Sequence, residues 1–214
     1  MKKIILFFFI VSSVALLRAQ SIGEMAPEKP LEIFPKNSLG LDIMFSEGGF
    51  GLGTFYRRQL EGDFTLFTDF SVSEAKDESE IEMYDYYGEP YTVGKKNRVF
   101  LLPLNLGLQY RLFKGELSEN LRPYLNCGLG PTMVVTTPYS EEFFTSFKWA
   151  QARYAAGGYI GLGANFGLDK SALIGFNLRY YVIEFFDKGV ESLEGKYNKR
   201  LGGIFITINI GTMY

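Results

Sequence analysis

The chain has 214 residues, a formal net charge of -2 and a pI near 5.4, so it lacks the strongly basic face of a nucleic-acid-binding protein. It contains no histidine, which excludes hydrolysis through an imidazole base as well as histidine-ligated zinc or copper sites. The single cysteine, Cys127, has no partner for an internal disulfide. We therefore expect a non-enzymatic protein with no cofactor, no metal site and no nucleic-acid partner.

The N-terminus has the pattern of a secretory signal peptide over residues 1–19. Two lysines precede the apolar run Ile4–Leu17, and Ala19 provides a small residue before the polar Gln20 at the cleavage point. A membrane-anchoring helix is the alternative, but the run is shorter than the ~20 residues that span a bilayer. Residues 20–36 carry three prolines and little alternation, which predicts an irregular periplasmic lead-in to one domain over residues 37–214.

Apolar residues alternate with polar or small ones in eight segments of that domain. A period of two is typical of strands whose two faces meet different surroundings. In the last segment Ile206, Ile208, Ile210 and Tyr214 share the apolar face, and together they form a C-terminal strand signal that ends on an aromatic residue. The eight predicted strands are 38–46, 50–60, 63–73, 98–112, 123–135, 154–168, 172–184 and 204–214.

The links between these strands alternate in length. The short links are 61–62, 113–120 and 169–171, and the long ones are 74–96, 136–153 and 185–199, with a tight first hairpin at 47–49. In membrane barrels the short turns face the periplasm and the long loops face outward. The pattern therefore predicts one closed, antiparallel, eight-stranded transmembrane β-barrel.

Composition favours the same fold. The chain has 24 glycines and 16% aromatic residues at a mean hydropathy of +0.02. A membrane barrel places aromatic residues at both lipid interfaces and small residues on a crowded inner wall. A secreted β-sandwich is the alternative fold.

Inward positions of the strands hold the candidate functional residues. An eight-stranded barrel is just wide enough for its own side chains, so mutual neutralisation in a filled lumen is favoured over a charged constriction in a solute pathway. Asp42, Asp69 and Arg179 fall at similar depth, and we expect Arg179 to pair with one of the two carboxylates. The predicted polar network of the lumen is Asp42, Asp69, Asn105, Arg111, Asn177 and Arg179.

Two of the long links have a distinctive composition. The spacing of acidic residues in link 74–96 matches no calcium-binding loop, so a solvated surface loop is favoured over a cation site, and its tyrosines are available to a partner. The aromatic residues of link 136–153 have three open placements: over the barrel mouth, at the lipid interface or against a protein. The acidic residues are Asp77, Glu78, Glu80, Glu82, Asp85 and Glu89; the tyrosines are Tyr84, Tyr86, Tyr87 and Tyr91; the other aromatics are Phe143, Phe144, Phe147 and Trp149.

Two segments resemble a known family. Leu102–Leu112 (LPLNLGLQYRL) and Arg122–Gly130 (RPYLNCGLG) are similar to consecutive strands of the porin-family outer-membrane β-barrel domain of Bacteroidetes-type bacteria. The junction Ala19-Gln20 also resembles signal sites in that group. The resemblance implies a barrel in the outer membrane and no catalytic residues, because such proteins share an architecture and not an activity.

The expected role is that of an integral outer-membrane barrel, structural or interacting, that presents long extracellular loops. A narrow porin-like channel for small or apolar solutes is one alternative, and a barrel subunit of a larger envelope secretion or assembly complex is another. The expected partners are outer-membrane lipids, the barrel-assembly machinery during biogenesis and an envelope protein bound through the outer loops.

Overall fold

The computed structural model describes residues 35–77, 79–88, 90–117, 120–166 and 171–214. The predicted signal peptide and residues 20–34 of the predicted lead-in lie outside these residues. Among the described residues, no helix has the length and apolar character needed to cross a membrane.

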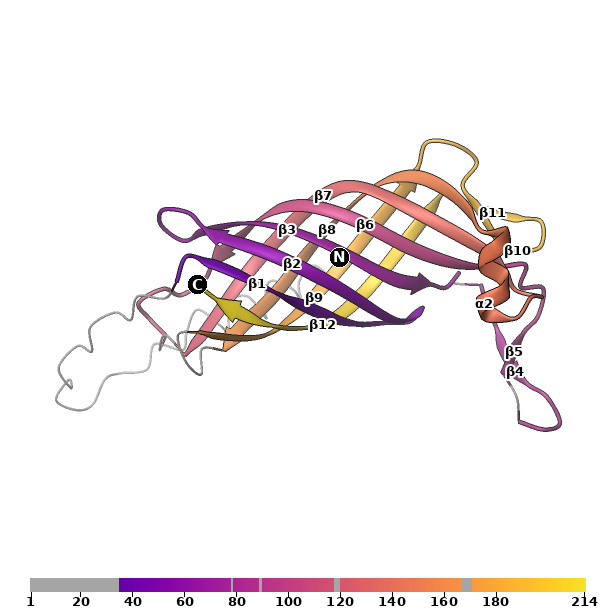
Figure 1. Ribbon diagram of the computed structural model, residues 1–214, viewed down its shortest axis with the longest axis horizontal. Coiled ribbons are helices and arrows are strands. Elements are labelled where there is room, and N and C mark those ends of the chain that lie inside the picture. The colour runs from indigo at the N-terminus through magenta and orange to yellow at the C-terminus, as the bar shows by residue number, and fades with distance from the viewer. Residues whose placement is uncertain (1–34, 78, 89, 118–119, 167–170) are drawn as a thin grey trace, which may run out of the picture. The chain divides into compact units, whose positions relative to one another are not determined.

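Eight long strands form one closed antiparallel sheet, which confirms the predicted fold (Figure 1). Each strand pairs with its neighbours in the chain, and the first and last strands pair to close the barrel. Closure leaves no exposed edge along the middle of the wall. The strands are β1 (Asn37–Ser46), β2 (Gly49–Gln59), β3 (Phe64–Ala75), β6 (Asn97–Arg111), β7 (Leu121–Pro138), β8 (Gln151–Phe166), β9 (Ala172–Phe185) and β12 (Arg200–Met213).

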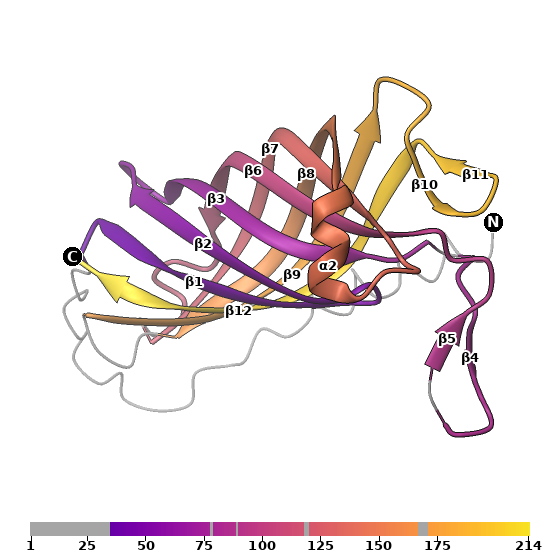
Figure 2. The same cartoon turned by 45° about the vertical axis from the view of Figure 1, so that its right-hand side comes forward.

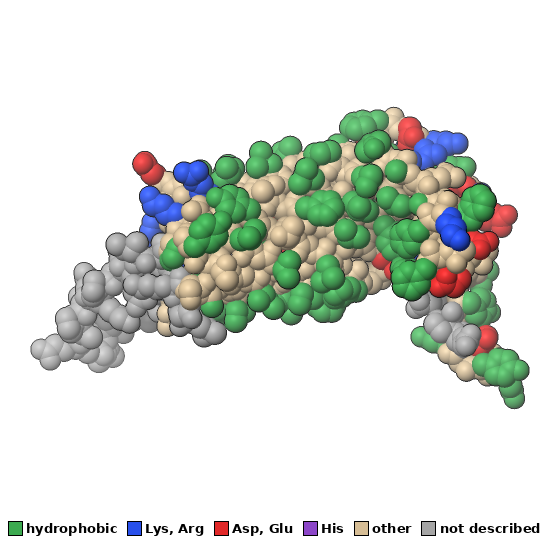
Figure 3. Space-filling view, viewed as in Figure 1, with side chains coloured by type: hydrophobic (Ala, Val, Ile, Leu, Met, Phe, Trp, Pro, Cys, Tyr) green, Lys and Arg blue, Asp and Glu red, His purple; other side chains and the backbone are tan. Residues whose placement is uncertain are grey.

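Side chains alternate between the outside and the lumen along every long strand. On β6, Leu104 and Leu106 are 50% and 59% exposed, whereas Asn105 between them is fully buried. Large apolar side chains are spread over the face of the outer wall that Figure 3 shows. Small residues are needed where large inner side chains meet the wall: a Cβ on Gly107 would lie 2.4 Å from the ring of Phe67. The period of two therefore separates an apolar outer surface from a crowded lumen.

Three strands extend by three or more residues beyond a predicted end. β7 continues to Pro138 and β8 begins at Gln151, so both extend into what was predicted as a loop. β12 begins at Arg200, four residues early, because Gly202 and Gly203 are part of the strand, with φ values of 142° and 140° that favour glycine. The β12–β9 ladder reaches Arg200, but the β1–β12 ladder ends at Ser46 opposite Phe205. β12 thus runs past the end of β1.

The long links contain short elements that the sequence did not predict. Link 74–96 contains a hairpin of β4 (Glu82–Tyr84) and β5 (Pro90–Thr92), and link 185–199 contains β10 (Val190–Leu193) and β11 (Lys196–Asn198). Between β7 and β8 lie the short helix α2 (Phe143–Ser146) and the 3-10 turn η1 (Phe147–Trp149). All of these elements lie at the same end of the barrel (Figure 2). The chain enters β1 and leaves β12 at the opposite end, where Asn37 and Tyr214 exchange backbone hydrogen bonds of 3.1 and 2.9 Å.

Candidate functional site

The centre of the lumen is an ion pair between Arg179 on β9 and Asp42 on β1. Nη2 of Arg179 lies 2.8 Å from Oδ2 of Asp42, and each side chain is about 1–2% exposed. The other carboxylate oxygen of Asp42 accepts a 2.5 Å hydrogen bond from Nδ2 of Asn209 on β12. Both oxygens of Asp42 therefore have donors, as a buried carboxylate requires.

Asp69 on β3 is the second buried carboxylate of this layer. It accepts a 2.8 Å hydrogen bond from Nδ2 of Asn105 on β6 and a 2.7 Å hydrogen bond from the hydroxyl of Tyr159 on β8. Nη1 of Arg179 lies 3.9 Å from Asp69 Oδ2, and its guanidinium lies 5.0 Å from the centre of the Tyr159 ring. One guanidinium is thus placed between two carboxylates. Six of the eight strands contribute to this polar layer through Asp42, Asp69, Asn105, Tyr159, Arg179 and Asn209.

The rings of Tyr159, Tyr181 and Phe205 cross the lumen on the loop side of the polar layer, and Phe67, which precedes Asp69 on β3, adds a fourth ring from the terminal side. Tyr159 and Tyr181 face each other at 4.7 Å between ring centres, Tyr181 meets Phe205 at 5.1 Å, and Phe67 meets Tyr159 at 6.0 Å. All four side chains are at most 4% exposed. These rings form a continuous layer from β3 to β12.

Mainly aliphatic side chains, with one further phenylalanine, fill the lumen beyond the aromatic layer. Ile183 and Phe185 follow Tyr181 at the inward positions of β9, and they share one buried cluster with Leu101 and Val134. Val190 of β10 belongs to the same cluster and is 1% exposed. The link after β9 therefore contributes a side chain to the apolar core at the barrel mouth.

The two long links 74–96 and 185–199, on either side of the mouth, are joined by hydrogen bonds and an ion pair to two buried carboxylates. Glu80 forms a 3.0 Å ion pair with Lys95 and accepts a 2.5 Å hydrogen bond from Ser192 of β10. Lys196 lies 2.9 Å from Asp77, which also accepts a hydrogen bond from Asn198. Asp77 and Glu80 are 6% and 8% exposed, so the prediction of a solvated acidic loop was wrong for these two residues. Lys95 of the same link neutralises Glu80, and Lys196 of the other link neutralises Asp77. The second pair joins residues far apart in the sequence, so no local pattern indicates it.

The tyrosines of link 74–96 are exposed, in contrast to its buried Asp77 and Glu80. Tyr84, Tyr86 and Tyr87 are 69%, 97% and 87% exposed at the tip of the β4–β5 hairpin. In the part of the chain that the structure describes, no group of three or more acidic or cysteine side chains is placed to hold a metal ion.

The end of the lumen nearer the chain termini contains a second set of contacts. Nη1 of Arg57 donates a 3.2 Å hydrogen bond to Oδ1 of Asn165, and its guanidinium lies 4.1 Å from the centre of the Phe55 ring. Tyr124 is fully buried, and its hydroxyl donates a 3.4 Å hydrogen bond to Oδ1 of Asn209. This set continues the network below the Asp42–Arg179 pair.

Four of the six residues predicted for the lumen network lie in one cluster. Asp42, Asp69, Asn105 and Arg179 lie together, and Asn177 is buried near them, although its amide makes no hydrogen bond with any residue that the structure describes. Arg111 is half-buried at the last position of β6, and its backbone N–H donates to the carbonyl of Asp63. Arg111 is thus six residues along β6 from Asn105, and its place in the lumen network stays a prediction. Ile206, Ile208, Ile210 and Tyr214, predicted as the C-terminal strand signal, are exposed on the outer face.

Sequence reasoning missed Tyr159 as a partner of Asp69. The available signal was the inward parity of two tyrosines, Tyr159 and Tyr181, but only the register places them opposite each other.

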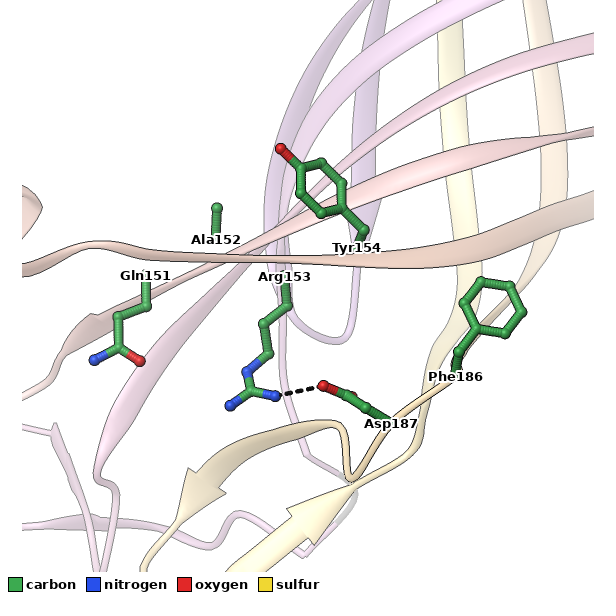
Figure 4. Close-up of a pocket in the computed structure, with 6 residues that line it drawn as sticks. All are labelled: Gln151, Ala152, Arg153, Tyr154, Phe186 and Asp187. Carbon is green, nitrogen blue, oxygen red and sulfur yellow. Dashed lines mark hydrogen bonds and ion pairs between the residues drawn. The ribbon is translucent and has the colours of Figure 1, made fainter.

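A shallow hollow of about 460 Å³ at the rim is lined by Gln151, Ala152, Arg153, Tyr154, Phe186 and Asp187 (Figure 4). Arg153 and Asp187 form a 2.7 Å ion pair there, which is half-open to solvent and suggests no chemistry.

Comparisons with known proteins give similarity to solved structures only. No family model matches the chain, and no curated protein matches it. Neisserial surface protein A is 12% identical, with a TM-score of 0.49 over 85% of this chain and 97% of that one. The N-terminal β-barrel domain of Pseudomonas aeruginosa OprF is 15% identical, with a TM-score of 0.45 over 83% and 98%. The attachment invasion locus protein Ail of Yersinia pestis is 14% identical, with a TM-score of 0.43 over 82% and 95%.

Proposed function

We propose that this chain is an integral outer-membrane barrel whose lumen does not conduct and whose loops have a structural or interaction role. It is a non-enzymatic protein, exported through residues 1–19 and inserted with the long links outside. The resemblance of two strands to the porin-family domain of Bacteroidetes-type bacteria belongs to the same proposal. The lumen and the outer wall provide the arguments below.

The apolar band on the outer wall has the height of a bilayer core. Along β6 the outward side chains run from Phe100 to Tyr110, a stretch of ten residue steps. At ~3.4 Å per residue and a strand tilt of ~40°, this stretch rises about 26 Å, close to the ~25 Å band of membrane barrels. Aromatic residues end the stretch on both sides, as the two lipid interfaces favour.

The observation that carries the proposal is the filling of the lumen. The ion-paired layer around Arg179, the aromatic layer around Tyr181 and the aliphatic layer around Ile183 follow one another along β9. A conducting pore needs a polar, water-wide path through all three layers. These layers instead resemble the packed core of a small barrel, which favours a structural or interaction role over the porin-like alternative.

Planar-bilayer recording tests this proposal. The intact mature chain should give no steady single-channel steps after refolding, with a heat-modifiable gel shift as the check that it has folded. A matched variant with Tyr159→Ala and Tyr181→Ala removes two rings of the aromatic layer and should be leakier than the intact chain if it folds. Large, steady conductance from the intact chain would overturn the proposal in favour of a channel.

The β4–β5 hairpin is the surface that best fits a protein partner. Its exposed tyrosines supply large contact area, and residues 81–93 include three acidic residues and no lysine or arginine. A partner with a basic surface matches this composition, whether the barrel acts alone or as a subunit of an envelope complex. Photo-cross-linking from position 86 on intact cells should capture one partner, and the same probe at Tyr197, an exposed tyrosine of the other long link, should not. Identical products from both positions would contradict a specific surface.

A further inference from the structure

The segment of α2 and η1 packs against the outside of the barrel. Phe100 has the same outward parity on β6 as the exposed Leu104 and Leu106. The rings of Phe143 and Phe147 pack on Phe100, with ring centres 6.2 and 5.6 Å away. Because Phe100 points away from the lumen, this segment lies against the outer wall and does not cover the mouth.

Specific contacts hold the segment in this position. Arg98 is the outward residue next to Phe100 on β6, toward the loop end of the barrel. Its Nη1 donates hydrogen bonds of 2.9 and 3.2 Å to the carbonyls of Pro138 and Glu141. The Arg98 guanidinium also lies 5.8 Å from the centre of the Phe143 ring. The carboxylate of Glu142 caps α2 by accepting a 3.0 Å hydrogen bond from the backbone N–H of Thr145. The segment is therefore a fixed element of the outer wall.

The free side of the segment is aromatic. Phe144 and Trp149 are 79% and 65% exposed, and the exposed Lys148 lies next to Trp149 in the chain. Phe100, on which the segment packs, is the uppermost residue of the apolar band on β6. The segment is thus placed at the level where hydrocarbon gives way to headgroups on the loop side.

We propose that α2 and η1 lie in the headgroup region of the outer leaflet, with Phe144 and Trp149 in direct contact with lipid. The exposed aromatic surface of the segment is continuous with the apolar band of the outer wall, so the lipid that surrounds the band also reaches Phe144 and Trp149. A protein partner would have to displace that lipid from the outer leaflet. Elements that lie flat in the interface combine tryptophan and phenylalanine with a basic residue that reaches the headgroups, as Lys148 does here. This inference rests on the membrane insertion proposed above.

Trp149 is the single tryptophan of the chain, so its fluorescence reports on this segment without any substitution. The folded protein is placed in phosphatidylcholine vesicles whose acyl chains carry bromine either near the headgroup or near the bilayer centre. Two single-tryptophan variants provide depth references in a Trp149→Phe background: Leu106→Trp on the mid-wall of β6 and Tyr86→Trp at the tip of the β4–β5 hairpin.

We expect Trp149 to emit at shorter wavelength than the Tyr86→Trp probe. Bromine near the headgroup should quench Trp149 more strongly than bromine near the bilayer centre. Aqueous iodide should quench Trp149 less than it quenches the Tyr86→Trp probe. Iodide quenching of Trp149 equal to that of Tyr86→Trp, without quenching by bromine, would overturn the inference, and so would protection from both quenchers, which would point to a protein contact. The Leu106→Trp probe separates the two proposals. Quenching of the Leu106→Trp probe by the deep bromine shows that the barrel is inserted, even if Trp149 proves to be in water. Absence of this quenching at Leu106→Trp refutes insertion itself.

Discussion

Replacing Arg179 with methionine tests how the lumen is stabilised. The change removes the cation 2.8 Å from Asp42 and 3.9 Å from Asp69 while keeping a long side chain in the same space. Among the residues that the structure describes, Asp69 keeps two donors, Asn105 and Tyr159, but Asp42 keeps only Asn209. Most of the loss should therefore come from Asp42, and breaking a buried pair by removing one partner costs roughly 3–5 kcal/mol.

Urea unfolding of the barrel in lipid vesicles, followed by the heat-modifiable gel shift, measures this loss. The control adds Asp42→Asn to Arg179→Met, which removes the unpaired charge and should restore most of the lost stability. A cost below about 1 kcal/mol for Arg179→Met would show that the pair contributes no more than an exposed one. Failure of Asp42→Asn to restore stability would show that the loss comes from packing and not from the carboxylate.

Two further predictions concern the outer wall and the mouth. Leu106→Arg places a charge near the middle of the apolar band and should destabilise the inserted barrel by about 2–4 kcal/mol, whereas Leu106→Phe should have little effect; equal tolerance of both would refute the assigned outer face. At the mouth, burial by itself would raise the pKa of Asp77, but hydrogen bonds from Lys196, Asn198 and the backbone of Ser79 outweigh it and lower the pKa. A lowered carboxyl pKa stabilises the contact above the ordinary value of ~4, and this contribution is lost as the pH falls through the lowered pKa. Spin labels on the two long links should therefore move apart in acid, and in Lys196→Met they should already be apart at neutral pH; a distance independent of both changes would contradict this account.

The strands could be predicted because their signal is local. Two faces with different surroundings impose a period of two on the sequence, and each strand shows it without its neighbours. The same parity places Asp42, Asp69 and Arg179 in the lumen, and their similar depth makes a pair predictable. The partnership of Asp69 with Tyr159 depends on the registers of the intervening strands, so no local pattern contains it.

The short elements inside the long links could not be predicted, because their contacts are also tertiary. The β10–β11 hairpin is held by contacts such as Lys196 with Asp77, whose partners are far apart in the sequence. Gly202 and Gly203 fell outside the predicted strand 204–214 because glycine weakens the signal of a strand, yet here they lie inside β12 where it runs past β1. The placement of Phe143 on the outer wall depends on Phe100 of another strand. Each of these features is tertiary and overrides the local signal.

Protease treatment of intact cells tests the central proposal of an outer-membrane barrel with its long links outside. Chymotrypsin added to whole cells should cut the processed protein at the exposed Tyr86 and Tyr87 of the β4–β5 hairpin and leave the membrane-embedded barrel heat-modifiable. The tyrosines Tyr110 and Tyr214, at the opposite end of the barrel, should become accessible only after the cells are opened. Recovery of the protein as a soluble periplasmic species, or cleavage at the hairpin only in opened cells, would contradict this account.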